Sequence, residues 1–116
     1  METVLIVDDH AGFRLLARRL LSAAGFEVVG EAADGSSALE SARRLRPGIV
    51  LLDVQLPDLD GFEVARRLAD ADLGTSTVLI STRDASAYRR RLSDTPALGF
   101  IPKSELSGTA LAKLVG

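Results

Sequence analysis

The chain has 116 residues, 47% of them hydrophobic, with a formal net charge of −2 and an isoelectric point near 5.3. This length is sufficient for one hydrophobic core, so we expect a single domain over residues 1–116. The slight acidity argues against direct nucleic-acid binding, and the lack of cysteine excludes a disulfide scaffold and thiolate metal sites.

No segment has the features of a signal peptide or of a membrane span. The amino terminus is not basic, and the first apolar run, residues 4–7, is too short for either role. We therefore expect a cytoplasmic protein that does not associate with membranes. The sequence contains no internal repeat, low-complexity segment or linker.

Buried strands and amphipathic helices alternate along the chain. Short apolar runs typical of buried strands lie at residues 3–7, 49–52, 77–81 and 97–101, and the partial alternation of residues 26–32 predicts a strand nearer an edge of the sheet. Apolar spacing of three to four residues and capping residues predict helices at residues 11–24, 34–45, 62–71 and 105–115, and we expect a short polar helix at residues 84–92. In the first helix we place on the apolar face Phe13, Leu16, Leu20 and Leu21. Gly25 then ends this helix.

Five strand–helix pairs in strict alternation predict a parallel sheet with helices on both faces and right-handed crossovers. We expect a doubly wound, flavodoxin-like (βα)5 fold of the α/β class, with strand order 2-1-3-4-5. In this order the first and third strands are neighbours. Their carboxyl ends then form the switch point at which such sheets bind ligands.

Acidic residues follow both strands that meet at this point. Asp8 and Asp9 come directly after the first strand, and Asp53 comes directly after the apolar run of the third. His10 follows the acid pair and is expected in the same loop. The topology therefore predicts three carboxylates in one crevice, contributed by two distant parts of the chain.

Polar groups of other types arrive at the same edge. Ser81 and Thr82 end the fourth strand, and Lys103 follows the fifth. An all-oxygen donor set suits Mg²⁺, and a carboxylate can act as a nucleophile toward phosphorus. A lysine and a hydroxyl group can then stabilise the phosphoryl oxygens. These residue types therefore point to phosphoryl-transfer chemistry.

Four motifs carry a resemblance to a known family: Val-Leu-Ile-Val-Asp-Asp-His, Leu-Leu-Asp-Val-Gln-Leu-Pro-Asp-Leu-Asp-Gly, Leu-Ile-Ser-Thr and Gly-Phe-Ile-Pro-Lys. In this order they resemble the receiver domain of bacterial two-component response regulators, and the resemblance covers essentially the whole chain. The Asp-Asp-His opening is most similar to receivers that precede a helix-turn-helix output domain. Since the chain ends after one last helix, we expect a stand-alone receiver or the amino-terminal part of a longer regulator.

The resemblance implies a role for each acid. Asp53 is the expected phosphoacceptor, which receives its phosphoryl group from a phosphohistidine of a sensor histidine kinase. Asp8 and Asp9 are expected to bind Mg²⁺ together with Asp53 and the backbone carbonyl of Gln55.

It also implies roles on the opposite side of the crevice. Lys103 is expected to contact the phosphoryl group. Ser81, 22 residues before Lys103, fits the family spacing of the switch hydroxyl better than Thr82, the second choice. Phe100 is the expected switch aromatic residue, which rotates inward when the hydroxyl moves toward the phosphate. The residues expected to lie beside the phosphoryl group and to set its lifetime are Gln55 and Arg83.

Two departures from the family pattern affect this switching side. Family members usually have a proline, joined by a cis peptide bond, directly after the lysine, whereas here Ser104 follows Lys103. A non-proline cis bond costs about 2.5–4 kcal/mol, so we expect a trans bond and a loop that can hold Lys103 differently. The small residue usual after the switch hydroxyl is replaced by Thr82.

We interpret the chain as a non-enzymatic phosphorylation switch that signals through the face formed by residues 84–92, 97–101 and 105–115. Residues 89–91, three consecutive arginines, are either a solvated helix face or part of a partner-binding surface. The expected partners are a sensor histidine kinase and a downstream protein target or missing output domain. The chain is expected to be a monomer or a phosphorylation-dependent dimer.

Two alternatives remain open. The first is a degenerate receiver that acts as an interaction module without phosphorylation. The second is an aspartate-nucleophile phosphatase. Such enzymes use a second acid two positions after the nucleophile, where this chain has Gln55.

Overall fold

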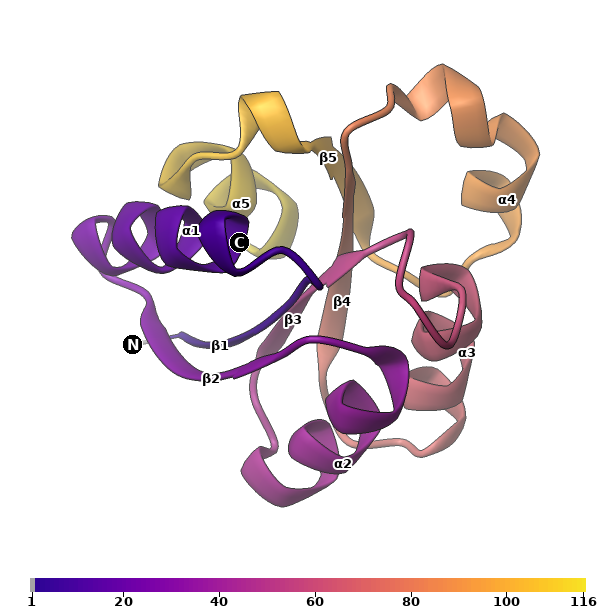
Figure 1. Ribbon diagram of the computed structural model, residues 1–116, viewed down its shortest axis with the longest axis horizontal. Coiled ribbons are helices and arrows are strands. Elements are labelled where there is room, and N and C mark those ends of the chain that lie inside the picture. Colours follow the sequence, from indigo (N-terminus) through magenta and orange to yellow (C-terminus); the bar gives the residue numbers. More distant parts are fainter. Residues whose placement is uncertain (1) are drawn as a thin grey trace.

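The computed structural model describes residues 2–116, which form a parallel sheet between two layers of helices (Figure 1). The strands are β1 (Thr3–Val7), β2 (Glu27–Ala32), β3 (Ile49–Asp53), β4 (Ser76–Ser81) and β5 (Gly99–Pro102). The helices are α1 (Ala11–Ala23), α2 (Gly35–Leu45), α3 (Gly61–Asp70), α4 (Arg89–Asp94) and α5 (Gly108–Val115), with short 3-10 helices η1 (Ala85–Tyr88) and η2 (Lys103–Glu105). The strand order β2-β1-β3-β4-β5 confirms the predicted flavodoxin-like topology.

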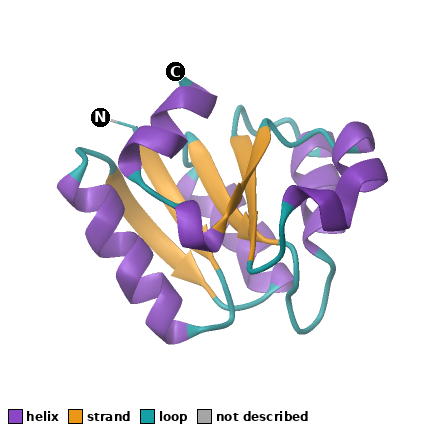
Figure 2. Ribbon diagram, turned by 90° about the horizontal axis from the view of Figure 1, so that it is seen from above, coloured by secondary structure: helices purple, strands orange, loops and turns teal. Residues whose placement is uncertain are grey.

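The sheet is buried because helices cover both of its faces (Figure 2). Successive side chains of a strand point to opposite faces, and β1 shows this clearly. Val4 and Ile6 pack with α1 and α5 in one apolar cluster, whereas Leu5 and Val7 pack with α2 and α3 in the other. Among residues 2–116, no helix has the length and apolar character needed to cross a bilayer.

Helix α1 differs from the prediction in its buried face. It ends at Ala23, and Gly25 follows with φ of 95°, as expected for a residue that ends a helix. The prediction for Leu16 is wrong, because its side chain is 51% exposed. The stripe that faces the sheet is centred on Ala17 and Leu21, four residues apart. Leu16 lies one position, or about 100°, away from this stripe.

The segment after β4 also differs from the single polar helix predicted over residues 84–92. It consists of η1 followed by α4, which extends to Asp94. Tyr88, at their junction, is buried. The Tyr88 side chain therefore anchors this segment to the core, which the polar composition of residues 84–92 did not predict.

The last strand and helix begin later than predicted. The Leu98 N–H donates to the Thr77 carbonyl at 2.7 Å, and β5 begins at the next residue, Gly99, three positions after Pro96. Helix α5 begins at Gly108 because the Ser107 side chain caps it, accepting from the Ala110 N–H at 3.0 Å.

The loop from β3 to α3 turns back tightly onto its own strand. The Gly61 N–H donates to the Val54 carbonyl at 2.7 Å, and a side chain at Gly61 would collide with the carbonyl oxygen of Asp53. Asp60 then caps α3 by accepting from the Phe62 N–H at 2.7 Å. A glycine is thus required for the return of the chain beside Asp53.

Asp58 joins the same loop to the start of α2. Its carboxylate accepts the N–H groups of Gly35 (2.7 Å) and Ser36 (3.0 Å) and the Ser36 hydroxyl. These donors, the Gly35 N–H first among them, lower the pKa of Asp58 from 3.8 to about 2. A carboxylate at a helix amino terminus is also favoured by the helix dipole.

We predict that Gly61→Ala lowers the free energy of unfolding by about 1–3 kcal/mol, because its methyl group meets rigid backbone. The matched control is Gly12→Ala in the first turn of α1, where an added methyl group meets nothing within 4 Å. The control should raise stability by roughly 0.5–1 kcal/mol. Urea denaturation measures both, and equal effects of the two substitutions would contradict the close packing of Gly61.

We further predict that Asp58 contributes to the acid sensitivity of the fold. Its pKa is lower in the folded than in the unfolded chain, so its stabilisation is present above pH 3.8 and is lost as the pH falls through about 2. Asp58→Ala should therefore be less stable than the wild type near neutral pH, and the difference should shrink in acid. Urea midpoints from about pH 5 down to about pH 2 test this. A difference independent of pH would show that the carboxylate charge has no role.

Candidate functional site

The pairing of β1 with β3 brings two acids together at the carboxyl edge of the sheet. Val7 pairs with Leu52, so the next residues, Asp8 and Asp53, leave their strands side by side. Both carboxyl groups are buried, with exposed fractions of 0% and 3%. The predicted meeting of the two strand ends is thus confirmed.

Asp9 and His10 extend this cluster toward solvent. One potential ligand atom each from Asp8, Asp9, His10 and Asp53 lie within 4.8 Å of one another. The His10 ring, which is exposed, places Nδ1 3.2 Å from Asp8 Oδ1 and 3.0 Å from Asp9 Oδ1. His10 therefore contacts both acids directly, whereas the sequence predicted only that it lies in the same loop.

Lys103 reaches the cluster from the opposite side. Its Nζ lies 2.6 Å from Asp8 Oδ2 and 3.2 Å from Asp53 Oδ2. No peptide bond among the described residues is cis, so the Lys103–Ser104 bond is trans, as predicted. The ammonium group also lies 4.7 Å from the centre of the Phe13 ring. The loop with Ser104 therefore delivers Lys103 to both buried acids.

The electrostatics of the site oppose ionisation of Asp53. Burial raises the pKa of Asp53, and the nearby Asp8 charge acts in the same direction. The Gln55 N–H, which donates to Asp53 Oδ1 at 3.1 Å, and the Lys103 charge oppose this shift only in part. Burial acts to lower the pKa of Lys103, but contact with the two carboxylates outweighs it and raises the pKa.

The donor set fits a hard divalent cation. Asp8 Oδ2 is buried, and its recorded contact among the described residues is the ion pair with the Lys103 ammonium group, 2.6 Å away. Buried carboxylates need compensating charge, and carboxylate oxygens are the protein ligands that Mg²⁺ prefers. A cation beside Asp8, Asp9 and Asp53 would offset the negative charge that a single lysine leaves in this cluster of three carboxylates.

The candidate switch hydroxyl is held differently. Ser81 is 1% exposed at the end of β4, and its Oγ lies 2.8 Å from Tyr88 Oη and accepts from the Arg83 N–H at 3.1 Å. Among residues 2–116, this hydroxyl makes no hydrogen bond to Asp53 or Lys103. The structure thus brings the acids and the lysine together and leaves Ser81 facing away.

The other candidates surround these groups. Gln55 is exposed and contacts Asp53 through its backbone N–H. Thr82 and Arg83 are exposed, whereas Phe100 is half-buried with its ring centre 5.8 Å from that of Tyr88.

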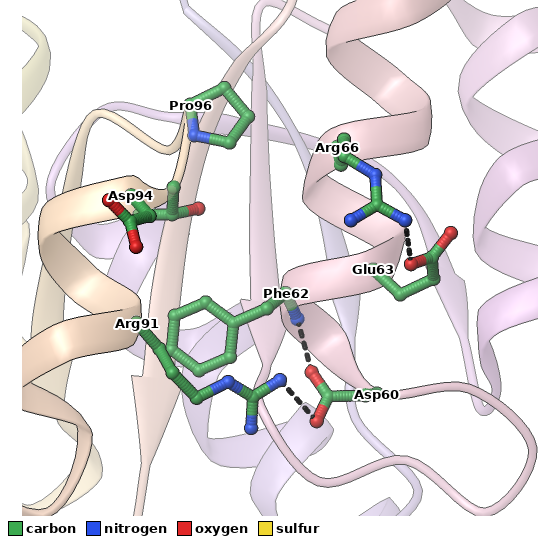
Figure 3. Close-up of a pocket in the computed structure, with 8 residues that line it drawn as sticks. Asp60, Phe62, Glu63, Arg66, Arg91, Asp94 and Pro96 are labelled. Carbon is green, nitrogen blue, oxygen red and sulfur yellow. Dashed lines mark hydrogen bonds and ion pairs between the residues drawn. The ribbon is translucent and has the colours of Figure 1, made fainter.

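Tyr88 is the site residue that sequence reasoning missed. The signal for it was weak: a lone tyrosine in an otherwise polar segment. It lies close to a cleft of about 300 Å³ between α3 and α4, away from the acids. In this cleft Arg91 pairs with Asp60 at 2.6 Å and covers the Phe62 ring at 4.2 Å (Figure 3).

Comparison with protein families and curated proteins gives consistent results. A family model described as the response regulator receiver domain matches residues 4–115. The chain is 34% identical to the response regulator GacA of Pseudomonas viridiflava, over 99% of the chain and 52% of that protein. It is 39% identical to a protein of Pseudomonas aeruginosa named as a transcriptional regulator, over 100% of the chain and 58% of that protein. The chain thus spans about half the length of these relatives.

A third relative has a different kind of name. The protein-glutamate methylesterase/protein-glutamine glutaminase 6 of Anaeromyxobacter dehalogenans is 41% identical over 92% of the chain and 31% of that protein. Similar modules therefore occur in longer proteins with unlike names.

Solved structures share the same architecture. The signal receiver domain assigned to NarL of Mycobacterium tuberculosis has a TM-score of 0.88 at 36% identity, with 99% of this chain and 97% of that one covered. A two-component response regulator of the LuxR family from Aurantimonas has a TM-score of 0.86 at 30% identity, covering 97% and 81%.

We predict that Asp53→Asn raises the free energy of unfolding near neutral pH when no divalent cation is present. The raised pKa of Asp53 means that its charged form opposes folding above the ordinary value of 3.8, and the amide removes that charge. Added Mg²⁺ should reverse the order. At a hundredfold excess over its dissociation constant, it should stabilise the wild type by about 2.7 kcal/mol, with most of this effect lost in the variant.

The matched control is Asp70→Asn on the exposed surface of α3, which should keep the full response to Mg²⁺. Urea denaturation with and without Mg²⁺ measures all three proteins. A variant that is destabilised without the cation, or that keeps the wild-type response to it, would contradict the proposed electrostatics.

Proposed function

The chain belongs to the response regulator receiver domain family, and on that premise we propose that it is a phosphorylation switch whose phosphoacceptor is Asp53. One observation carries this proposal. Asp53 is a buried carboxylate with a raised pKa, paired with Lys103 at 3.2 Å and placed beside Asp8. A carboxylate that is poorly stabilised as an anion is a more reactive nucleophile.

The proposed reaction transfers a phosphoryl group from a phosphohistidine of a sensor histidine kinase. A carboxylate oxygen of Asp53 attacks phosphorus, the P–N bond to the histidine breaks, and the electron pair of that bond leaves with the imidazole. An aspartyl phosphate is the product. Lys103 holds one phosphoryl oxygen by its charge and hydrogen bonds.

We assign Mg²⁺ to the acidic cluster, with Asp8, Asp9, Asp53 and the backbone carbonyl of Gln55 as its protein ligands. When bound, Mg²⁺ supplies positive charge that offsets the carboxylates and the developing charge on the phosphoryl oxygens. Support comes from the carboxylate oxygens that the cluster offers and from the excess of its three carboxylates over the single ammonium group of Lys103. Acidic clusters of this kind are typical of receiver domains.

Ser81 remains our choice for the switch hydroxyl, because its side chain is buried at the site edge whereas Thr82, the second choice, is exposed. Phe100, half-buried on β5, is the proposed switch aromatic residue. The residues proposed to set the lifetime of the phosphoryl group are Gln55 and Arg83.

The proposed output surface is formed by α4, β5 and α5. Its arginines at residues 89–91 are exposed. Arg91 already pairs with Asp60, so Arg89 and Arg90 are the two available to an acidic partner. We propose that residues 1–116 form one receiver unit, located in the cytoplasm, as a monomer or phosphorylation-dependent dimer. Its signal passes to a downstream protein or to an attached output domain, and the receiver itself does not bind nucleic acid or membranes.

Incubation with Mg²⁺ and acetyl phosphate should add the mass of a single phosphoryl group, measured on the intact protein. Asp53→Asn should abolish the addition because it removes the nucleophile, and Lys103→Met should slow it by roughly a hundredfold because a phosphoryl oxygen loses its charged donor. Asp70→Asn should react as the wild type does.

The other outcomes identify the alternatives. A folded wild-type protein that neither gains mass nor binds Mg²⁺ would indicate a phosphorylation-independent interaction module. Continuous release of phosphate from phosphomonoesters would indicate a phosphatase.

A further inference from the structure

The hydrogen bond between Ser81 and Tyr88 joins two buried side chains seven residues apart. Tyr88 is the last residue of η1 and is 7% exposed, and its Oη lies 2.8 Å from Ser81 Oγ. Among residues 2–116, Ser81 is the hydrogen-bond partner that the structure records for the Tyr88 hydroxyl. A buried hydroxyl pair of this kind is costly to separate unless each group finds another partner.

The Tyr88 ring connects this hydrogen bond to three further elements. It lies between Phe62 of α3 and Phe100 of β5, with ring centres 5.7 Å and 5.8 Å away and an interplanar angle of 57° in each pair. The third element is α4, because the guanidinium group of its Arg91 lies over the Phe62 ring and pairs with Asp60 (Figure 3). Any displacement of Tyr88 would therefore disturb the contacts of α4 with α3.

The capacity of the Ser81 hydroxyl is limited to one proton and two lone pairs. The Arg83 N–H occupies one lone pair, and either hydroxyl of the Ser81–Tyr88 pair could be the donor of their hydrogen bond. With the Ser81 proton directed at Tyr88 Oη, that single proton is the one that a phosphoryl oxygen would take. Asp53 pairs across the sheet with Ile80, the residue directly before Ser81. A phosphoryl group on Asp53 would therefore place anionic oxygens beside this hydroxyl.

Those oxygens are stronger acceptors than a phenol hydroxyl. A hydrogen bond to an ionised oxygen is roughly twice as strong as one between neutral groups. The phosphoryl group and Tyr88 thus compete for the same serine, and the phosphoryl group is favoured.

We propose that Tyr88 is a positioning residue that holds the Ser81 hydroxyl away from Asp53 in the unphosphorylated state. Phosphorylation draws Ser81 to the phosphoryl oxygens, breaks its hydrogen bond to Tyr88 and releases η1 and α4 from the core. Tyr88, from η1, therefore takes part in the switch beside Phe100. This inference rests on the proposed function of Asp53.

The composition of the chain provides a direct probe. Tyr88 is the single tyrosine, and the chain has no tryptophan, so the tyrosine fluorescence and the tyrosine absorbance band report on this residue alone. Acetyl phosphate with Mg²⁺ should change both signals in the wild type. The change should be absent in Ser81→Ala, which lacks the competing hydroxyl, and in Asp53→Asn.

Tyr88→Phe tests the same point kinetically. It keeps the ring between Phe62 and Phe100 and removes the hydroxyl, so phosphorylation should be about two- to tenfold faster, the factor expected for one net hydrogen bond. Ser81→Ala and the double variant with Tyr88→Phe should react at the same rate as each other, because Tyr88 acts through Ser81. A purely structural tyrosine would lower stability and leave the phosphorylation rate unchanged.

The outcomes separate this inference from the function on which it rests. If intact mass shows a phosphorylated wild type but the Tyr88 signals do not change, the inference is overturned and the function stands. A slower rate in Tyr88→Phe also overturns it, since the tyrosine would then be orienting Ser81 toward the phosphoryl group. A wild type that gains no phosphoryl group overturns both. Should Tyr88→Phe not fold, the spectroscopic comparison with Ser81→Ala still decides.

Discussion

The contact of Lys103 with Asp8 and Asp53 is the interaction on which the site depends. Two carboxylates buried at adjacent strand ends repel one another, and an uncompensated buried charge is strongly destabilising. Lys103, directly after β5, reaches both acids, at 2.6 Å and 3.2 Å. This ammonium group offsets only part of the cost of burying the two acids, because the pKa of Asp53 is still raised. The chemistry and the stability of this edge are therefore coupled, and a cation or phosphoryl group that binds there alters both.

The two sides of the crevice are built with different rigidity. On the acceptor side, Gly61 packs directly on the backbone of Asp53, and Asp58 joins the same loop to α2. These contacts fix Asp53 relative to the sheet, as a nucleophile requires. On the switching side, the segment from η1 to α4 has a single buried residue, Tyr88. Few buried contacts mean a low cost of local rearrangement, which suits a segment that changes with phosphorylation.

This division explains how one domain can serve unlike proteins. The relatives share the receiver portion while the chain spans about half or less of their length, and their names differ. A phosphoryl group shifts the balance between two conformations only by the difference in its interactions with them. In the proposed switch, the acceptor side determines whether phosphorylation occurs, and the switching side determines which surface responds. On that proposal, a departure on the switching side such as Ser104 can change the signal without loss of the acceptor chemistry.

The sequence by itself determined the alternation of strands and helices, the strand order, and the meeting of Asp8 with Asp53. These follow from local rules, since buried strands form continuous apolar runs and right-handed crossovers restrict the topology. The sequence could not assign Leu16 to the exposed face, because the apolar spacing along α1 fits two neighbouring placements of the buried stripe. Nor could it place the start of α5, since caps compete within a few residues. The packing of Tyr88 against Phe62 and Phe100 and its hydrogen bond to Ser81 were decided by the tertiary structure alone. Such contacts join elements far apart in the chain, and their geometry depends on how whole layers pack.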